Sequence, residues 1–447
     1  MNERPPSKNI DFASFNRRRF LLGTAATGAA LFGNAAAISR AAAEGKYAGQ
    51  TLNFMIIQPH VVTGRKLAED FEKLTGAKVN VTPVPYDQIQ TKATLDVQSG
   101  TNEFDVIDYW YTTLSALVED GIVTDVTDWI ERDKAELQPD DVLASFYDTY
   151  TLRDGKRWGF PYDGDSHLLF YNKEILDRNG LKAPTTWEEY LEVTKAVTAA
   201  ESKNGIYGAA VLGGKAPIII GSTFANRLAG YGGTFLKEDG TSALDSEAAL
   251  AAAQSLKDII PHAMPTPLET RFEEGLPAFL GGKVALIEFW SDLGVYAQDP
   301  KGSKIVDKWG VVRNPTGGKN TKNIAAFNAG FGFAITSGSK NKELAWEFVK
   351  FGTGPKVQKE LVLLTGSGID PSRKSQLYGP EYRAFAPKLQ EALAGQLESG
   401  LPWPTNVQSP KLQQILADGL AEILAGQKEP TDAIAGIHAA WNQALSS

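Results

Sequence analysis

The order of its predicted strands and helices most constrains how this chain can fold. Short apolar or alternating runs, typical of strands, occur at 51–58, 78–85 and 104–110. Between them lie two segments with helical spacing of apolar residues, at 64–76 and 86–100, each ending in glycine. The order strand–helix–strand–helix–strand predicts an α/β protein with a parallel sheet flanked by helices.

The ends of these strands predict where a ligand binds. In parallel sheets, ligands lie beyond the carboxyl ends of the strands. Here those ends are Gln58–His60, the segment near Tyr86, and Asp108–Tyr111. Two of the three are rich in polar and aromatic groups, so this edge of the sheet is a candidate site.

A second α/β unit is predicted to begin near residue 165. The chain has 447 residues, which favours two domains over one. No repeat and no low-complexity linker separates the two units. Further strands are expected at 158–172 (interrupted by Gly164), 207–214, 284–290, 308–315 and 324–335. Further helices are expected at 183–200 (capped by Thr185 or Thr186), 246–260, 340–354, 411–426 and 430–447.

The first 43 residues have the features of an export signal. Arg17, Arg18 and Arg19 precede a weakly apolar run at 20–38, and small residues at 41–43 offer a cleavage site near Ala43. The arginines followed by Phe and Leu also resemble the twin-arginine signature. An uncleaved membrane anchor is the alternative, although Gly, Ala and Thr dilute the run. The mature protein is therefore predicted to be periplasmic.

Composition excludes several classes of function. The chain has no cysteine, so it has no disulfide, thiolate metal site or cysteine nucleophile. The net charge is -8, and the part after residue 43 carries about -12. Because an acidic body repels phosphate backbones, no nucleic-acid partner is expected. Glycine-rich stretches at 317–323 and 366–371 lack the spacing of nucleotide-binding loops, and no hydrolase motif is present. No cofactor is predicted.

Several longer motifs occur in an order typical of one protein family. They are FDVIDYW followed by LSALVEDGIVTDVTDWI, then GKRWGFPYDGDSHLLFYNKEILDRNGLKAPTTWEEYLEV, FLGGKVALIEFW, GSKNKELAWEFVKFGTGPKVQKEL and GSGIDPSRKS. Together with the export signal, they resemble the family 1 extracellular solute-binding proteins of ABC importers, which include maltose-binding and other sugar-binding proteins. The resemblance covers nearly all of residues 47–447.

The resemblance implies a fold and a function. The fold is a two-lobe periplasmic-binding-protein fold of type II, each lobe a mixed sheet flanked by helices, with a hinge of several crossing segments. Lobe one would comprise 47–163 and 331–368, and lobe two 165–329 and 370–447, with crossings near 161–165, 327–333 and 365–372. The protein would bind a sugar or polyol between the lobes and deliver it to membrane permease subunits. It would be a monomer and not an enzyme.

Candidate ligand-binding residues combine aromatic rings with polar groups, because rings cover the apolar faces of a sugar and polar groups bind its hydroxyls. The resemblance places an aromatic platform at Trp290 and a polar contact at Asp165. For each residue, core packing or a surface ion pair is the alternative. The full set is Gln58, His60, Asp108, Tyr109, Trp110, Asp163, Asp165, Tyr231, Trp290, Asn328, Arg373 and Trp403.

Three alternatives to neutral sugar binding remain open. Asp163 and Asp165 lie two residues apart on a predicted strand, which is compatible with the acid and base of an inverting glycosidase. With His167 they also offer oxygen and nitrogen ligands for a metal ion. Arg373, with lysines and backbone amides, could instead bind a phosphorylated or sulfonated sugar.

Overall fold

The computed structural model describes residues 45–394, 396–397 and 400–447. The predicted export signal at 1–43 lies outside the described residues. Among the helices that are described, none is long and apolar enough to span a membrane.

The first sheet confirms the predicted strand–helix–strand order. Its five strands run in the order β2-β1-β3-β12-β6. Strand β1 pairs in parallel with β2 and β3, whereas β12 pairs antiparallel with β3 and β6. The strands are β1 (Thr51–Ile57), β2 (Lys78–Val84), β3 (Val106–Trp110), β6 (Phe160–Asp163) and β12 (Phe331–Ile335).

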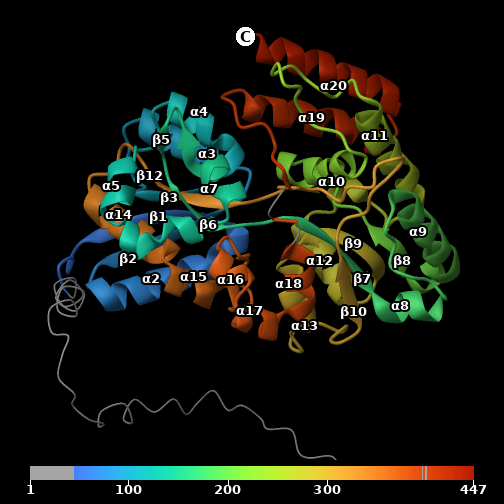
Figure 1. Cartoon of the computed structure of the whole chain (residues 1–447), viewed down its shortest axis with the longest axis horizontal. Helices are drawn as coiled ribbons and strands as arrows, with labels where there is room; N and C mark the ends of the chain where they lie inside the picture. The colour runs from blue at the N-terminus through green and yellow to red at the C-terminus, as the bar shows by residue number, and fades with distance from the viewer. Residues whose placement is uncertain (1–44, 395, 398–399) are drawn as a thin grey trace, which may run out of the picture.

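Helices cover both faces of this first sheet (Figure 1). The longest, α2, presents Leu67 and Phe71 to the core, and Gly76 ends it in a left-handed conformation with φ of 76°. The helices of this half are α2 (Val61–Thr75), α3 (Ile89–Gln98), α4 (Leu114–Glu119), α5 (Thr127–Arg132), α6 (Lys134–Leu137), α7 (Ala144–Thr151), α14 (Lys342–Thr353) and α15 (Pro355–Val362). A short hairpin pairs β4 (Leu152–Arg153) with β5 (Lys156–Arg157).

A second sheet forms the other half of the molecule. Its order is β10-β7-β9-β8, with β8 parallel to β9 and the other pairs antiparallel. The strands are β7 (His167–Asn172), β8 (Tyr207–Ala210), β9 (Val284–Trp290) and β10 (Trp309–Val312). All seven residues of β9 are buried, as expected for a strand covered on both faces.

The helices of the second half include the predicted one capped by Thr186, whose hydroxyl accepts a hydrogen bond from Glu189 N at 3.1 Å. They are α8 (Lys173–Arg178), α9 (Trp187–Glu201), α10 (Pro217–Gly230), α11 (Glu247–Ile259), α12 (Phe272–Leu280), α13 (Leu293–Gln298), α18 (Pro387–Ala394), α19 (Ser409–Leu424) and α20 (Pro430–Leu445). Two short helices, α16 (Lys374–Leu377) and α17 (Pro380–Phe385), precede α18.

One predicted strand is divided in the structure. The run at 324–335 forms β11 (Ala325–Ala326) and β12, separated by four residues. Gly330, with φ of 115°, has a conformation that β-strand residues do not adopt, so the strand is interrupted there. β11 pairs instead with β13 (Gly400–Leu401).

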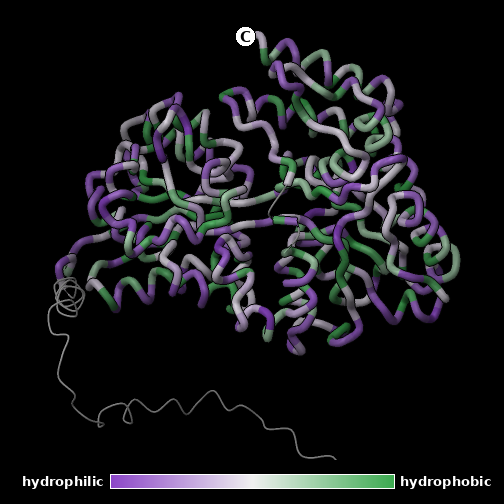
Figure 2. The backbone as a smooth tube through the Cα atoms, viewed as in Figure 1, coloured by the Kyte–Doolittle hydropathy of each residue, from purple (hydrophilic) through white to green (hydrophobic). Residues whose placement is uncertain are grey.

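The two halves lie side by side and are joined by extended segments (Figure 1). One segment lies between β6 and β7, another precedes β12, and a third follows α15. Hydrophobic stretches gather along the sheets, and hydrophilic stretches occur mostly on the outer helices and loops (Figure 2). The buried hydrophobic residues of both halves form one continuous cluster that extends across the junction between them.

Candidate ligand-binding site

A cavity open to solvent lies between the two sheets. The first half contributes Ile57, Pro59, His60, Tyr86 and Phe331, and the second half contributes Ile218, Ile219, Phe272, Trp290 and Asp292. The connecting segments contribute Asp165, Ala329 and Gly368. Both halves and three connections therefore meet at one site.

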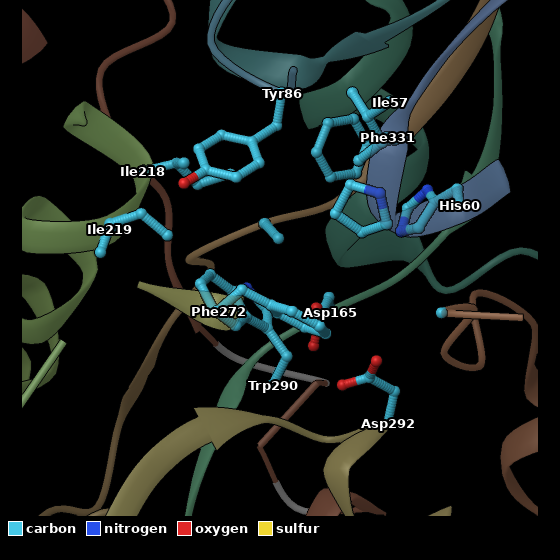
Figure 3. Close-up of a pocket in the computed structure, with 13 residues that line it drawn as sticks. Ile57, His60, Tyr86, Asp165, Ile218, Ile219, Phe272, Trp290, Asp292 and Phe331 are labelled. Atoms are coloured by element: carbon cyan, nitrogen blue, oxygen red, sulfur yellow. The ribbon is translucent and has the colours of Figure 1, made fainter. Parts of the chain in front are cut away.

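Trp290 forms part of one wall (Figure 3). It ends strand β9 and is 7% exposed, and its indole Nε1 has no hydrogen-bond partner within the described part of the chain. His167 packs edge-on behind it, with ring centroids 4.4 Å apart, and is held by Asn226 Nδ2 at 2.9 Å from His167 Nδ1. Trp290 is thus fixed in place, with its buried N–H unpartnered.

Two carboxyl groups, those of Asp165 and Asp292, lie on the same side of the cavity (Figure 3). Asp165 is 4% exposed, and the Oδ1 atom of each accepts no hydrogen bond among the described residues. Asp370 lies behind them and accepts a hydrogen bond from the Ser291 hydroxyl. Its backbone N–H donates to Asp163 Oδ1 at 2.8 Å. Four carboxyl groups are therefore concentrated at the junction of the halves.

Burial raises the pKa of each of these carboxyl groups. For Asp163, Asp165 and Asp292 the charge of neighbouring Asp370 raises the pKa further, well above the usual value near 3.8. The pKa of Asp370 is raised to about 7 by burial, although the Ser291 hydrogen bond opposes the rise. The group consequently holds protons near neutral pH when no ligand supplies donors or positive charge.

His60 belongs to the opposite wall and is held in a neutral state. Burial lowers its pKa to about 3. Its Nδ1 lies 2.6 Å from the Tyr162 hydroxyl, which donates to Asp108 Oδ2 at 3.0 Å. The imidazole thus presents a fixed, uncharged edge beside Phe331, 5.3 Å between ring centroids.

A family model described as bacterial extracellular solute-binding protein matches residues 60–359. That span is more than half of the chain and includes most of the cavity wall. The chain belongs to this family. Members bind solutes for transport and do not convert them, so this solute-binding protein is not an enzyme.

Individual relatives agree with this assignment. An erythritol/L-threitol-binding protein of Mycolicibacterium smegmatis is 24% identical over 349 residues, 74% of this chain and 72% of that protein. A solute-binding protein of Agrobacterium radiobacter K84, solved with ribitol, is 28% identical with a TM-score of 0.80, covering 89% of this chain and 99% of that one. Maltose-bound MalE3 of T. maritima has the same TM-score at 22% identity, covering 88% and 100%. The fold is therefore the two-lobe periplasmic-binding-protein fold expected from the sequence.

Three of the predicted ligand-binding residues line the cavity of the solute-binding protein: His60, Asp165 and Trp290. Asp108 and Asp163 lie just behind its wall. Asp108 is fully buried and accepts hydrogen bonds from Ile57 N and Tyr162, which connects β1, β3 and β6. Neither carboxyl group reaches the cavity surface.

Four further predicted residues form a buried junction away from the cavity. Tyr109 donates its hydroxyl proton to Tyr150 O at 2.9 Å. Trp110 packs edge-on against Trp403, with centroids 5.4 Å apart, and Trp403 Nε1 donates to Asn328 Oδ1 at 3.2 Å. Trp110, Trp403 and Asn328 contact one another across the halves, Tyr109 bonds within the first half, and none of the four lines the cavity. A buried aromatic side chain with a satisfied polar group gives the same sequence signal as a binding platform.

Arg373, predicted to contact the ligand, lies outside the cavity wall. Its guanidinium is fully buried and donates to three backbone carbonyls, those of Leu137, Gln138 and Thr353. These bonds fasten the segment before α16 to the first half, and Arg373 does not line the cavity. Gln58 is exposed, Tyr231 is half-buried at the end of α10, and neither lines the cavity.

The geometry also contradicts the catalytic and metal alternatives. Asp163 binds the backbone of Asp370 and does not line the cavity, so Asp163 and Asp165 do not face one substrate bond. His167 turns to Asn226 and the Trp290 ring, away from a shared ligand position. In the described residues, no group of three or more His, Cys, Asp or Glu could hold a metal ion.

The sequence interpretation missed several wall residues. Asp292 follows the end of β9 by two positions, so the strand-end rule that located His60 would have found it if applied to the second sheet. Phe331 lies in a predicted crossing whose side-chain directions were unknown. Ile218, Ile219 and Phe272 begin helices after loops and carry no signal that distinguishes them from core residues.

Proposed function

We propose that this solute-binding protein captures a sugar or polyol in the cavity and delivers it to the permease subunits of an ABC importer. The observation that carries the proposal is the pairing of Trp290, with its unpartnered N–H, and Asp165, with an unpartnered oxygen, on one cavity wall. A hydroxylated ring or chain supplies an acceptor for the first and donors for the second. The relatives solved or named with ribitol, erythritol and threitol support this class.

The aromatic walls suit the carbon skeleton of such a ligand. Figure 3 shows Tyr86 and Phe331 on one side of the cavity and Phe272 and Trp290 on the other. Aromatic faces bury the C–H groups of a sugar or polyol while its hydroxyls point to the polar residues. We therefore assign ligand contact to His60, Asp165 and Trp290, and add Tyr86, Phe272 and Asp292.

The mechanism follows from the position of the cavity between the halves. A ligand contacts both walls only when the lobes are closed, so binding shifts the equilibrium towards the closed form. The permease then distinguishes closed from open protein. We propose lobe boundaries of 47–163 with 331–368 and 165–329 with 370–447, supported by the segregation of the strands of the two sheets into these ranges.

An anionic sugar is not favoured as the ligand. No Lys or Arg is among the described residues that line the cavity. Arg373, the side chain assigned to hold the anionic group, is engaged by backbone carbonyls. A phosphate or sulfonate would instead meet the carboxyl groups of Asp165 and Asp292.

As a member of an extracellular family, the protein is exported. We propose that it leaves the cytoplasm by the twin-arginine route, is cleaved near Ala43 and acts as a monomer that does not bind nucleic acid. The arginines at 17–19 and the acidic charge of the remaining chain support these assignments.

A thermal-shift screen over monosaccharides, disaccharides, pentitols, hexitols and sugar phosphates tests the function. Bound ligand raises the melting temperature by mass action. We expect at least one neutral sugar or polyol to raise it, with no product detectable by chromatography after incubation. A shift with sugar phosphates alone, or recovery of a cleaved saccharide, would contradict the proposal.

A further inference from the structure

The charges around the cavity are unbalanced. Two carboxyl groups line it, two more lie directly behind, and the His60 imidazole on the facing wall is neutral. Arg271 lies near the Tyr86 hydroxyl, and the acidic side chains of Glu273 and Asp87 are near it as well. Among the described residues that line the cavity there are two carboxyl groups and no Lys or Arg.

Two acceptor atoms in the wall are unsatisfied. Asp165 Oδ1 and Asp292 Oδ1 are buried, and neither accepts a hydrogen bond among the described residues. A buried carboxyl oxygen without a donor is costly, and a hydrogen bond to a charged group is stronger than one to a neutral group. A neutral hydroxyl satisfies the missing hydrogen bond, whereas an ammonium group also favours the ionised form of carboxyl groups whose pKa is otherwise raised.

The rest of the cavity wall is also suited to a cation. The rings of Tyr86, Phe272, Trp290 and Phe331 surround the space beside the carboxyl groups (Figure 3). Aromatic faces attract ammonium groups, and the attraction increases where water is excluded. An alkylammonium group additionally brings three N–H donors, enough for both unsatisfied carboxyl oxygens.

We propose that the ligand is a hydroxylated molecule carrying a protonated amine, an amino sugar or amino polyol, and that its ammonium group binds between Asp165 and Asp292. This inference rests on the proposed function and narrows its substrate class. It assigns Asp292 a role in selecting the charge of the ligand, distinct from the stacking role of Trp290.

Calorimetric titration with matched pairs of compounds tests the inference. The pairs are D-glucosamine and D-glucose, 1-amino-1-deoxy-D-sorbitol and D-sorbitol, and chitobiose and cellobiose, all at pH 7.5 and constant salt. We expect the amine to bind about tenfold more tightly than its neutral partner in at least one pair, the difference between a charged and a neutral hydrogen bond. Equal or tighter binding of the neutral partner wherever binding occurs would overturn the inference.

The variant Asp292→Asn separates charge from shape. It should lower affinity for the amine about tenfold and change affinity for the neutral partner by less than about threefold. Asp432→Asn, on the exposed face of α20, is the matched control and should change neither. If Asp292→Asn lowered the affinity for the amine and for the neutral compound equally, Asp292 would not select ligands by their charge.

The outcomes also separate the inference from the proposed function. Binding of a neutral sugar or polyol without any preference for amines would refute the inference and leave the function intact. If neither the matched compounds nor any sugar or polyol in the thermal screen bound, both would be wrong.

Discussion

At the residue scale, the site depends on polar groups that the fold buries without satisfying. Most buried polar atoms in proteins are hydrogen-bonded. Here the Trp290 N–H and one oxygen each of Asp165 and Asp292 lack partners at one cavity, whereas the two terminal guanidinium nitrogens of Arg373 and the Tyr109 hydroxyl donate to backbone carbonyls. An unpartnered polar atom together with a place in the cavity wall, more than residue type, separates the proposed ligand-binding side chains from structural ones.

Replacement of Trp290 tests this distinction. Trp290→Ala should weaken ligand binding about thirtyfold or more, because a buried aromatic contact is worth about 2 kcal/mol or more. Trp290→Phe retains a ring and should lose less. Trp158→Ala, half-buried away from the cavity, is the control. Calorimetry with the best compound from the thermal screen measures all three, and unchanged affinity in Trp290→Ala would remove the residue from the site.

The buried carboxyl groups predict how stability depends on pH. Because the pKa of Asp370 is about 7 when folded and near 3.8 otherwise, the folded state holds the extra proton between these values. Its stabilising effect is present below pH about 4 and is lost as the pH rises through about 7. The raised pKa values of Asp163, Asp165 and Asp292 likewise make the folded state less stable as the pH rises.

His60 and His167 act in the opposite direction, because burial lowers the pKa of each to about 3. Their contribution is lost as the pH falls below about 6.5. The melting temperature of the ligand-free protein should therefore fall between pH about 6.5 and 8.5, where only the carboxyl groups act. Asp370→Asn should reduce this fall, whereas Asp432→Asn should not. The melting temperature is measured by calorimetry at each pH. If it falls as steeply with pH in Asp370→Asn as in the original protein, the four carboxyl groups are not electrostatically coupled.

At the element scale, the sequence predicted the sheets better than the site. Periodicity and turn residues located β1, β2, β3 and their helices, because each signal is local. The position of His60 followed from the rule that ligands lie beyond strand ends. Whether Trp110 and Trp403 face a ligand or each other depends on segments nearly 300 residues apart in sequence, which no local pattern reports.

Gly330 tests the connection that leads into β12. Its φ is 115°, and a Cβ atom there would overlap the Tyr150 hydroxyl. Gly330→Ala should lower the free energy of unfolding by about 2 kcal/mol or more through backbone strain and crowding. Gly302→Ala is the control, since a Cβ at that position meets open space. Denaturant unfolding measures both, and equal stability of the two variants would contradict this account of the crossing.

At the scale of the whole molecule, the central claim is that the two halves enclose an unaltered hydroxylated ligand. The family match and the two sheets establish the architecture. The identity of the ligand was not predictable from the sequence, because residues from both halves and three connections define the cavity. Their side-chain directions emerge only from the assembled fold.

The most direct test of this claim is a crystal structure of the protein with the compound that gives the largest thermal shift. We predict an intact ligand between Trp290 and Tyr86, with a hydroxyl or amine within hydrogen-bond distance of Asp165. A ligand bound elsewhere on the surface, or a cleaved product in the cavity, would contradict it.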